Sequence, residues 1–285
     1  MPRFRILLLL IAALALGNAC VAETSPARRP FVIPTDINGY RTLFPAPSSD
    51  SASRPLLIGI FEGEGSAESG ITNVIASLRA LPAAQIIRLD PESILRENLS
   101  RFDVLAFTGG YSVRQAKSLG PAGKDAVRRY VAEGGRYFGI CAGAYLAVVG
   151  EEWSLGLLNA RLAPGNRWRG QTFLDIELTP EGRAALAPVD VVFKIRYNNG
   201  PVIRPLGRPD LPPYVVLASF RGEIVRKDGQ PGIMMGTPAI VMAPYGRGRV
   251  LTISPHAENT PGIENLIPLA IIELTRTFPP VAAKR

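Results

Sequence analysis

The chain is poor in the side chains that hold metal ions. Its 285 residues include one histidine, His256, and two cysteines, Cys20 and Cys141. A structural zinc site uses about four Cys or His ligands, and a catalytic zinc site uses about three protein ligands. We therefore expect no metal ion and no other cofactor. Loss of an N-terminal leader with Cys20 would leave one thiol, which excludes a disulfide framework.

Long basic runs are also absent, although the formal net charge is +8. The arginines and lysines are scattered singly or in pairs. Dedicated nucleic-acid binding requires a basic stripe or a recognised motif, and the sequence has neither, so we expect no nucleic-acid partner. The hydrophobic content of 47% and charged content of 20% exclude a disordered, collagen-like or coiled-coil chain.

The first residues have the order of a secretory signal peptide. Two arginines precede an apolar run at 6–16, and small residues follow at 17–22. The run is shorter than the roughly 20 residues that cross a bilayer. We therefore predict that residues 1–22 are a signal peptide, cleaved after Ala19 or Ala22, and that the protein is exported to the periplasm or secreted.

A lipidated N-terminus at Cys20 is the alternative end of this leader, and it is the one feature that would tie the protein to a membrane. Residues 23–54 are rich in proline and serine, which predicts an extended arm or linker. A single globular domain is expected over residues 55–280.

The first half of this domain alternates strand and helix patterns. Continuous apolar runs are typical of strands buried on both faces, and apolar residues three and four positions apart are typical of helices. This alternation predicts a mostly parallel sheet flanked by helices, an α/β fold. The expected strands are 55–61, 84–89, 102–107 and 136–140, and the expected helices are 71–81, 121–133 and 142–149.

The second half has a different pattern. Strand-like pieces separated by proline and glycine predict an antiparallel extension of the sheet or a small separate sheet. A hairpin is expected from 239–243 and 250–254, and an amphipathic helix from 263–278 closes the domain. The strand-like pieces are 173–178, 189–197 and 214–220.

Cys141 lies between an expected strand and an expected helix, within Gly139-Ile140-Cys141-Ala142-Gly143. Small residues on both sides of a nucleophile leave room for the strained turn that lifts its side chain to the edge of a sheet. The following helix N-terminus favours thiolate over thiol, and the Ala142 N–H can face a developing oxyanion. The alternative is a small buried cysteine at a tightly packed position.

His256 follows the last expected strand, and Glu258 lies two residues further on. Residues two apart in extended chain point the same way, so Glu258 can orient the imidazole. Nucleophile, base and orienting carboxylate form the general arrangement of covalent catalysis. Gly109-Gly110 follows the strand at 102–107 and could supply a second backbone N–H to an oxyanion.

These motifs resemble the class I glutamine amidotransferases in order and spacing. The chain is most similar to the amidotransferase-like domain found at the N-terminus of fungal-type biotin–protein ligases and as stand-alone bacterial proteins. Residues 129–145 carry most of this similarity, residues 197–201 carry a second part, and the resemblance covers about residues 55–278. It implies a flavodoxin-like core with an antiparallel extension.

The resemblance also implies roles for individual residues. Cys141 matches the nucleophile, His256 the base and Glu258 its orienter. Gly110 and Ala142 match the oxyanion donors, with Tyr111 as the alternative. Tyr145 stands where working glutaminases usually carry glutamine, which argues against glutamine as the substrate. The candidate site residues are Cys141, His256, Glu258, Gly109, Gly110, Tyr111, Ser112, Ala142, Tyr145, Asn198 and Asn199, the last two within the 197–200 loop.

Three functions fit this pattern. The first is an exported thiol-dependent amidase or acyl-transfer hydrolase that acts on a small-molecule or peptide amide. The second is a binding module that kept the fold and lost turnover. The third is a redox-active thiol of a DJ-1-like fold, in which Glu62 or Glu64 would contact Cys141. A redox thiol has no need of the His256-x-Glu258 pair, which distinguishes it from the first.

Overall fold

A computed structural model describes residues 55–276, with gaps at 82–83, 166–167 and 225–231. The expected signal peptide at 1–22, the arm at 23–54 and Cys20 lie outside the described residues, as do the last four residues of the expected 55–280 domain. None of the helices in the described part of the chain is both long and apolar enough to cross a bilayer.

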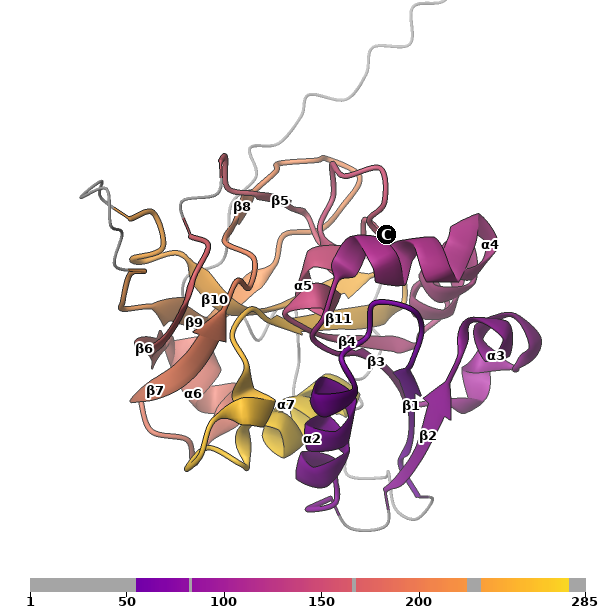
Figure 1. Ribbon diagram of the computed structural model, residues 1–285, viewed down its shortest axis with the longest axis horizontal. Helices are drawn as coiled ribbons and strands as arrows, with labels where there is room; N and C mark the ends of the chain where they lie inside the picture. Colours follow the sequence, from indigo (N-terminus) through magenta and orange to yellow (C-terminus); the bar gives the residue numbers. More distant parts are fainter. Residues whose placement is uncertain (1–54, 82–83, 166–167, 225–231, 277–285) are drawn as a thin grey trace, which may run out of the picture.

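One large sheet runs through the described part of the protein, with the strand order β2-β1-β3-β4-β11-β10-β9-β6-β7 (Figure 1). From β2 to β11 neighbouring strands are parallel, and from β11 to β7 they are antiparallel. The expected α/β fold with an antiparallel extension is therefore confirmed. The strands are β1 Leu57–Phe61, β2 Gln85–Leu89, β3 Val104–Phe107, β4 Arg136–Ile140, β6 Gln171–Leu178, β7 Val192–Asn198, β9 Val215–Phe220, β10 Pro238–Tyr245 and β11 Gly248–Ile253.

Burial along the strands explains the two halves of the sheet. The parallel strand β3 is buried at every residue, and β4 at all but its first. Helices cover both faces there, so a continuous apolar run is required. In β6 and β7 buried residues alternate with more exposed ones, as expected where one face of an antiparallel sheet meets solvent.

Helices pack on both faces of the sheet (Figure 1). On one face α2 (Glu68–Leu78) and α6 (Pro180–Leu186) each contact α7 (Leu266–Thr275). On the other, α4 (Ser112–Ala132) contacts both α3 (Pro91–Arg96) and α5 (Ala142–Ala147). Each layer encloses its own apolar cluster against the sheet.

Several elements differ from the sequence prediction. The helix expected at 121–133 begins at Ser112, because two helical segments meet at Gly120, whose φ of 64° makes a kink before Pro121. The helix α6 was not predicted, although Thr179 caps it by accepting from the Gly182 N–H and Pro180 occupies its first turn. A small sheet of β5 (Ala160–Leu162) and β8 (Ile203–Pro205) was also missed.

The topology brings three distant segments together. Strands β3, β4 and β11 are parallel neighbours, so their carboxyl ends lie at the same edge of the sheet. Gly109 and Gly110 follow β3, Cys141 follows β4, and His256 follows β11. Short 3-10 turns at Leu99–Arg101 and Ala257–Asn259 complete the described elements.

Candidate active site

Cys141 occupies a strained turn between β4 and α5. Its backbone φ is 50° and ψ is −97°, and it is one of two described non-glycine residues with positive φ. The turn packs tightly, since a Cβ on Gly143 would lie 2.1 Å from the Phe107 carbonyl oxygen. The residue is 6% exposed. This geometry is that of a nucleophile elbow, in which the chain holds one residue in a costly conformation.

His256 and Glu258 form a buried pair. His256 Nδ1 lies 2.7 Å from Glu258 Oε1, and the Glu258 side chain has no exposed surface. The backbone of His256 is fixed by its N–H, which donates to the Arg196 carbonyl at 2.8 Å. The structure therefore brings Glu258 against the imidazole nitrogen that an orienting carboxylate would contact.

The charge state of His256 follows from its neighbours. Burial opposes the charged form, but hydrogen bonds with Cys141 and Glu258 outweigh burial and raise the pKa of His256 to about 10. The imidazole is therefore protonated at neutral pH, and both ring nitrogens donate. An imidazolium cannot accept a further proton, so in this charge state His256 can act only as a donor.

The carbonyl oxygen of Asn198 lies beside both catalytic candidates. It is 3.7 Å from Cys141 Sγ and 3.4 Å from His256 Nε2. The sequence indicated the 197–200 loop as a pocket wall, but nothing in the sequence pointed to this backbone oxygen. It gives the Nε2–H of the imidazolium an acceptor in the free protein.

Tyr145 forms a hydrogen bond with that loop. Its hydroxyl donates to the Asn199 carbonyl at 3.0 Å and accepts from the Trp168 indole N–H at 3.1 Å. Burial raises the pKa of Tyr145, so the hydroxyl keeps its proton. The Tyr197 hydroxyl lies 2.7 Å from the Gly200 carbonyl oxygen, on the same loop. The residue that departs from the amidotransferase pattern therefore holds the loop whose carbonyl faces Cys141.

The glycine turn after β3 lies against the same site. A Cβ on Gly109 would be 3.0 Å from His256 Cε1 and 3.9 Å from Cys141 Cβ. Gly110 has a φ of 136°, which favours glycine. The Tyr111 N–H donates to the Gly65 carbonyl at 2.8 Å, so this amide is not available to a ligand. Gly110 and Tyr111 were the two alternatives for the backbone N–H that donates to an oxyanion at this turn, and only the Gly110 N–H remains.

A cavity of about 850 Å³ opens over Cys141 and His256. This volume lies within the usual range of small-molecule sites. Among the sequence candidates, Ala142, Tyr197 and Gly200 do not line it. Sequence reasoning missed several residues that do, among them Arg114, Glu151, Trp153, Arg169, Gln171, Arg196 and Asn259.

The two glutamates of the redox alternative lie elsewhere. Neither Glu62 nor Glu64 lines the cavity. The Glu62 carboxylate forms an ion pair with Arg88 on β2. The structure therefore does not bring these carboxylates to Cys141.

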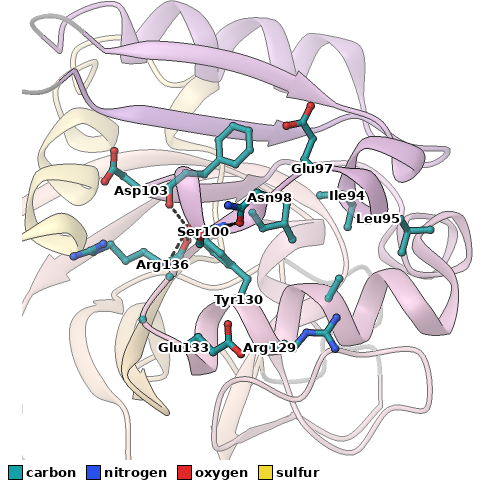
Figure 2. Close-up of a pocket in the computed structure, with 15 residues that line it drawn as sticks. Ile94, Leu95, Glu97, Asn98, Ser100, Asp103, Arg129, Tyr130, Glu133 and Arg136 are labelled. Atoms are coloured by element: carbon teal, nitrogen blue, oxygen red, sulfur yellow. Dashed lines mark hydrogen bonds between the residues drawn. The ribbon is translucent and has the colours of Figure 1, made fainter.

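A second hollow, of about 390 Å³, lies at the opposite end of the parallel strands (Figure 2). Asp103 and Arg136 line it at the beginnings of β3 and β4, together with Tyr130. The Tyr130 hydroxyl donates to the Phe102 carbonyl and accepts from the Arg136 N–H, which ties α4 to the sheet. Its lining, drawn wholly from described residues, contains no cysteine or histidine.

Comparisons with solved structures give distant matches. A ThuA-like protein from Bacteroides uniformis is 15% identical, with a TM-score of 0.56 over 80% of this chain and 94% of that chain. A ThuA-like protein from Parabacteroides merdae is 11% identical, with a TM-score of 0.55 over 78% of this chain and 90% of that chain. At these identities the likeness shows the fold alone.

A glutamine amidotransferase from Thermotoga maritima is also among the matches, with 13% identity and a TM-score of 0.49 over 72% of this chain and 77% of that chain. A comparison with curated proteins gave no significant match. The family model described as biotin-protein ligase, N terminal, matches residues 56–270, which include β1, the Cys141 elbow, His256 and Glu258. The chain therefore belongs to the biotin–protein ligase N-terminal domain family.

Proposed function

We propose that the protein is a thiol-dependent acyl-transfer hydrolase that cleaves amides, with Cys141 as nucleophile, His256 as acid and base, and Glu258 as its orienter. The observation that carries this proposal is geometric: Cys141, His256 and Glu258 line one cavity, and His256 Nδ1 lies 2.7 Å from Glu258 Oε1. The pKa of His256 is raised to about 10 by Cys141 and Glu258 together, against the effect of burial. Such a pairing is typical of a thiolate–imidazolium couple.

The proposed reaction starts from a Cys141 thiolate beside the His256 imidazolium. The Cys141 thiolate attacks the amide carbonyl carbon, forming a C–S bond and moving the carbonyl electron pair to oxygen. Collapse of this intermediate breaks the C–N bond, and the amine leaves with the proton from His256 Nε2. The result is a thioester on Cys141 and a neutral imidazole.

Water then completes the cycle. Neutral His256 takes a proton from a water molecule while the water oxygen adds to the thioester carbon. Collapse breaks the C–S bond, releases the carboxylic acid, and restores thiolate and imidazolium. The buried Glu258 carboxylate keeps the imidazole in one orientation through both steps.

The N–H groups of Gly110 and Ala142 are the proposed donors to the oxyanion. Ala142 is the first residue of α5, where N–H groups have no partner within the helix. Gly110 is the residue before Tyr111, whose own N–H already donates to the Gly65 carbonyl. Two backbone donors of this kind stabilise the charge that develops on the carbonyl oxygen.

The substrate is a small-molecule or peptide amide other than glutamine. Tyr145 supports this choice, because its hydroxyl is bonded to Asn199 and Trp168 where the amidotransferase pattern places a glutamine side chain. The same residue favours a binding module without turnover as the second candidate.

Trapping with a library of electrophilic amides separates these two candidates. We expect covalent labelling of Cys141 in the wild-type protein, much slower labelling in His256→Ala, and none at this site in Cys141→Ala. Equal labelling of wild type and His256→Ala by every member of the library would favour the binding module.

We further propose that the protein is exported, on the basis of the basic, apolar and small residues at 3–22. Intact-mass analysis of the protein from its native cells should give a chain that begins at Cys20 or Glu23. A full-length form beginning at Met1 would contradict export by this leader.

A further inference from the structure

Three arginines line the cavity over Cys141. Arg114 comes from the first turn of α4, Arg169 from the segment before β6, and Arg196 from β7. Among the described residues, none of the three forms an ion pair with a carboxylate. Apart from Glu258, which is bonded to His256, Glu151 is the one carboxylate of the lining.

Two of these guanidinium groups are stacked on aromatic rings. The Arg169 guanidinium lies 5.6 Å from the centre of the Tyr145 ring, and that of Arg114 lies 5.1 Å from the Tyr111 ring. Stacking uses the face of a guanidinium and leaves its in-plane N–H donors available for a carboxylate. The rings therefore hold the two cations in place without neutralising them.

Arg196 reaches the cavity because of strand geometry. It lies two residues before Asn198 on β7, so both side chains point to the same side of the sheet, and both line the cavity. The Arg196 backbone is bridged to that of His256, so the two residues are direct partners across this bridge, and both line the cavity. The arginines that line the cavity therefore come both from α4 and from the antiparallel half of the sheet.

We infer that the site selects an anionic acyl substrate, an amide that carries at least one free carboxylate which Arg169 and Arg196 bind beside Cys141. This inference rests on the proposed thiol chemistry and adds the substrate class. Unpaired arginines around a concave, partly enclosed site raise the local concentration of anions and bind carboxylates through paired N–H donors. Amides whose acyl part carries a second carboxylate, such as acidic peptides, are substrates of this class.

Alkylation of Cys141 by reagents of different charge tests the inference directly. Iodoacetate and iodoacetamide form the same C–S bond with loss of iodide, but iodoacetate alone is anionic. The quantity to measure is the ratio of their second-order rates at Cys141, at pH 7 and low salt, followed by mass spectrometry of the peptide that contains this residue. The ratio removes any change in thiol reactivity that affects both reagents equally.

We expect Arg169→Gln and Arg196→Gln each to lower the iodoacetate/iodoacetamide ratio by about threefold, and the double variant by about tenfold. The matched control is Arg247→Gln, which removes the same charge from the exposed β10–β11 turn at the opposite edge of the sheet. It should leave the ratio unchanged. About 1 M NaCl, where the screening length is about 3 Å, should bring the wild-type ratio toward that of the double variant.

The inference is overturned if the double variant keeps the wild-type ratio, or if Arg247→Gln lowers the ratio as much. Failure of the proposed function is a different result, in which His256→Ala leaves the iodoacetamide rate unchanged. As a second readout, hydrolysis of a carboxylate-bearing amide and its neutral carboxamide analogue should show the same charge preference, with KM for the acid rising in Arg169→Gln. Equal KM values for both analogues in wild type would contradict the inference.

Discussion

The Tyr145 hydroxyl donates a hydrogen bond to the carbonyl oxygen of Asn199, 54 positions along the chain, at 3.0 Å. The neighbouring Asn198 carbonyl faces Cys141 and His256. Asn199 itself has a positive φ of 55°. Its N–H donates to the Gly170 carbonyl, and its side-chain oxygen accepts from the Gly170 N–H. A single side chain on α5 therefore helps to set where a backbone oxygen lies beside the reactive sulfur.

Removal of that hydroxyl in Tyr145→Phe should destabilise the protein by about 1–3 kcal/mol, because the buried Trp168 N–H loses its acceptor. Tyr111→Phe is the matched control, since Tyr111 is 68% exposed, and it should change the free energy of unfolding by less than about 0.5 kcal/mol. Urea denaturation measures both. Equal stability of the two variants would show that the Tyr145 hydroxyl contributes nothing.

The elbow should store strain at Cys141. A residue with a Cβ at φ 50° and ψ −97° costs about 1–3 kcal/mol, whereas glycine adopts such angles freely at an entropic cost of about 0.5–1 kcal/mol. Cys141→Gly should therefore be more stable than Cys141→Ala by about 1 kcal/mol, as measured by thermal or chemical unfolding. If the alanine variant is equally stable or more so, the turn is not strained.

The motifs around the site could be predicted from the sequence because each depends on a few adjacent residues. The strand before Cys141, the glycines on both sides of it and the His256-x-Glu258 spacing are local patterns, and the structure brings them to one sheet edge. The parallel half of the sheet was predictable for a similar reason, since buried strands and their crossover helices are each continuous in sequence.

The contacts that complete the site could not be predicted in this way. The Asn198 carbonyl is 57 positions from Cys141, and backbone oxygens have no sequence signal. The arginines at 114, 169 and 196 are scattered among the 32 basic residues of the chain, and nothing in the sequence marks them as lining one cavity. That the Tyr111 N–H is already bonded could not be predicted either, because its acceptor, the Gly65 carbonyl, lies in a distant part of the sequence.

The titration of His256 is directly observable because it is the chain's only histidine. In an untagged protein its single imidazole proton signal should show the charged form throughout neutral pH, with a midpoint at about 10. Glu258→Gln and Cys141→Ala each remove a group that favours the charge, so each should lower the midpoint by at least about one pH unit. A wild-type midpoint near 6.5 would contradict the pairing.

The same pKa predicts the direction of the pH dependence of stability. His256 binds its proton more tightly in the folded state, because its pKa is raised from 6.5 to about 10. Its contribution to the free energy of unfolding is therefore complete below about pH 6.5 and is lost as the pH rises to about 10. The stability difference between wild type and Glu258→Gln should shrink over this range. A difference that is constant from pH 6 to 10 would exclude this linkage.

The rate of Cys141 alkylation by iodoacetamide at pH 6–7 measures whether His256 keeps this thiol reactive. His256→Ala should slow this reaction by about tenfold or more, the equivalent of about 1.4 kcal/mol, because the thiolate loses its imidazolium partner. Glu258→Gln should slow it less, since the imidazole remains. An unchanged rate in His256→Ala would show that the two residues do not act together and would contradict the catalytic account.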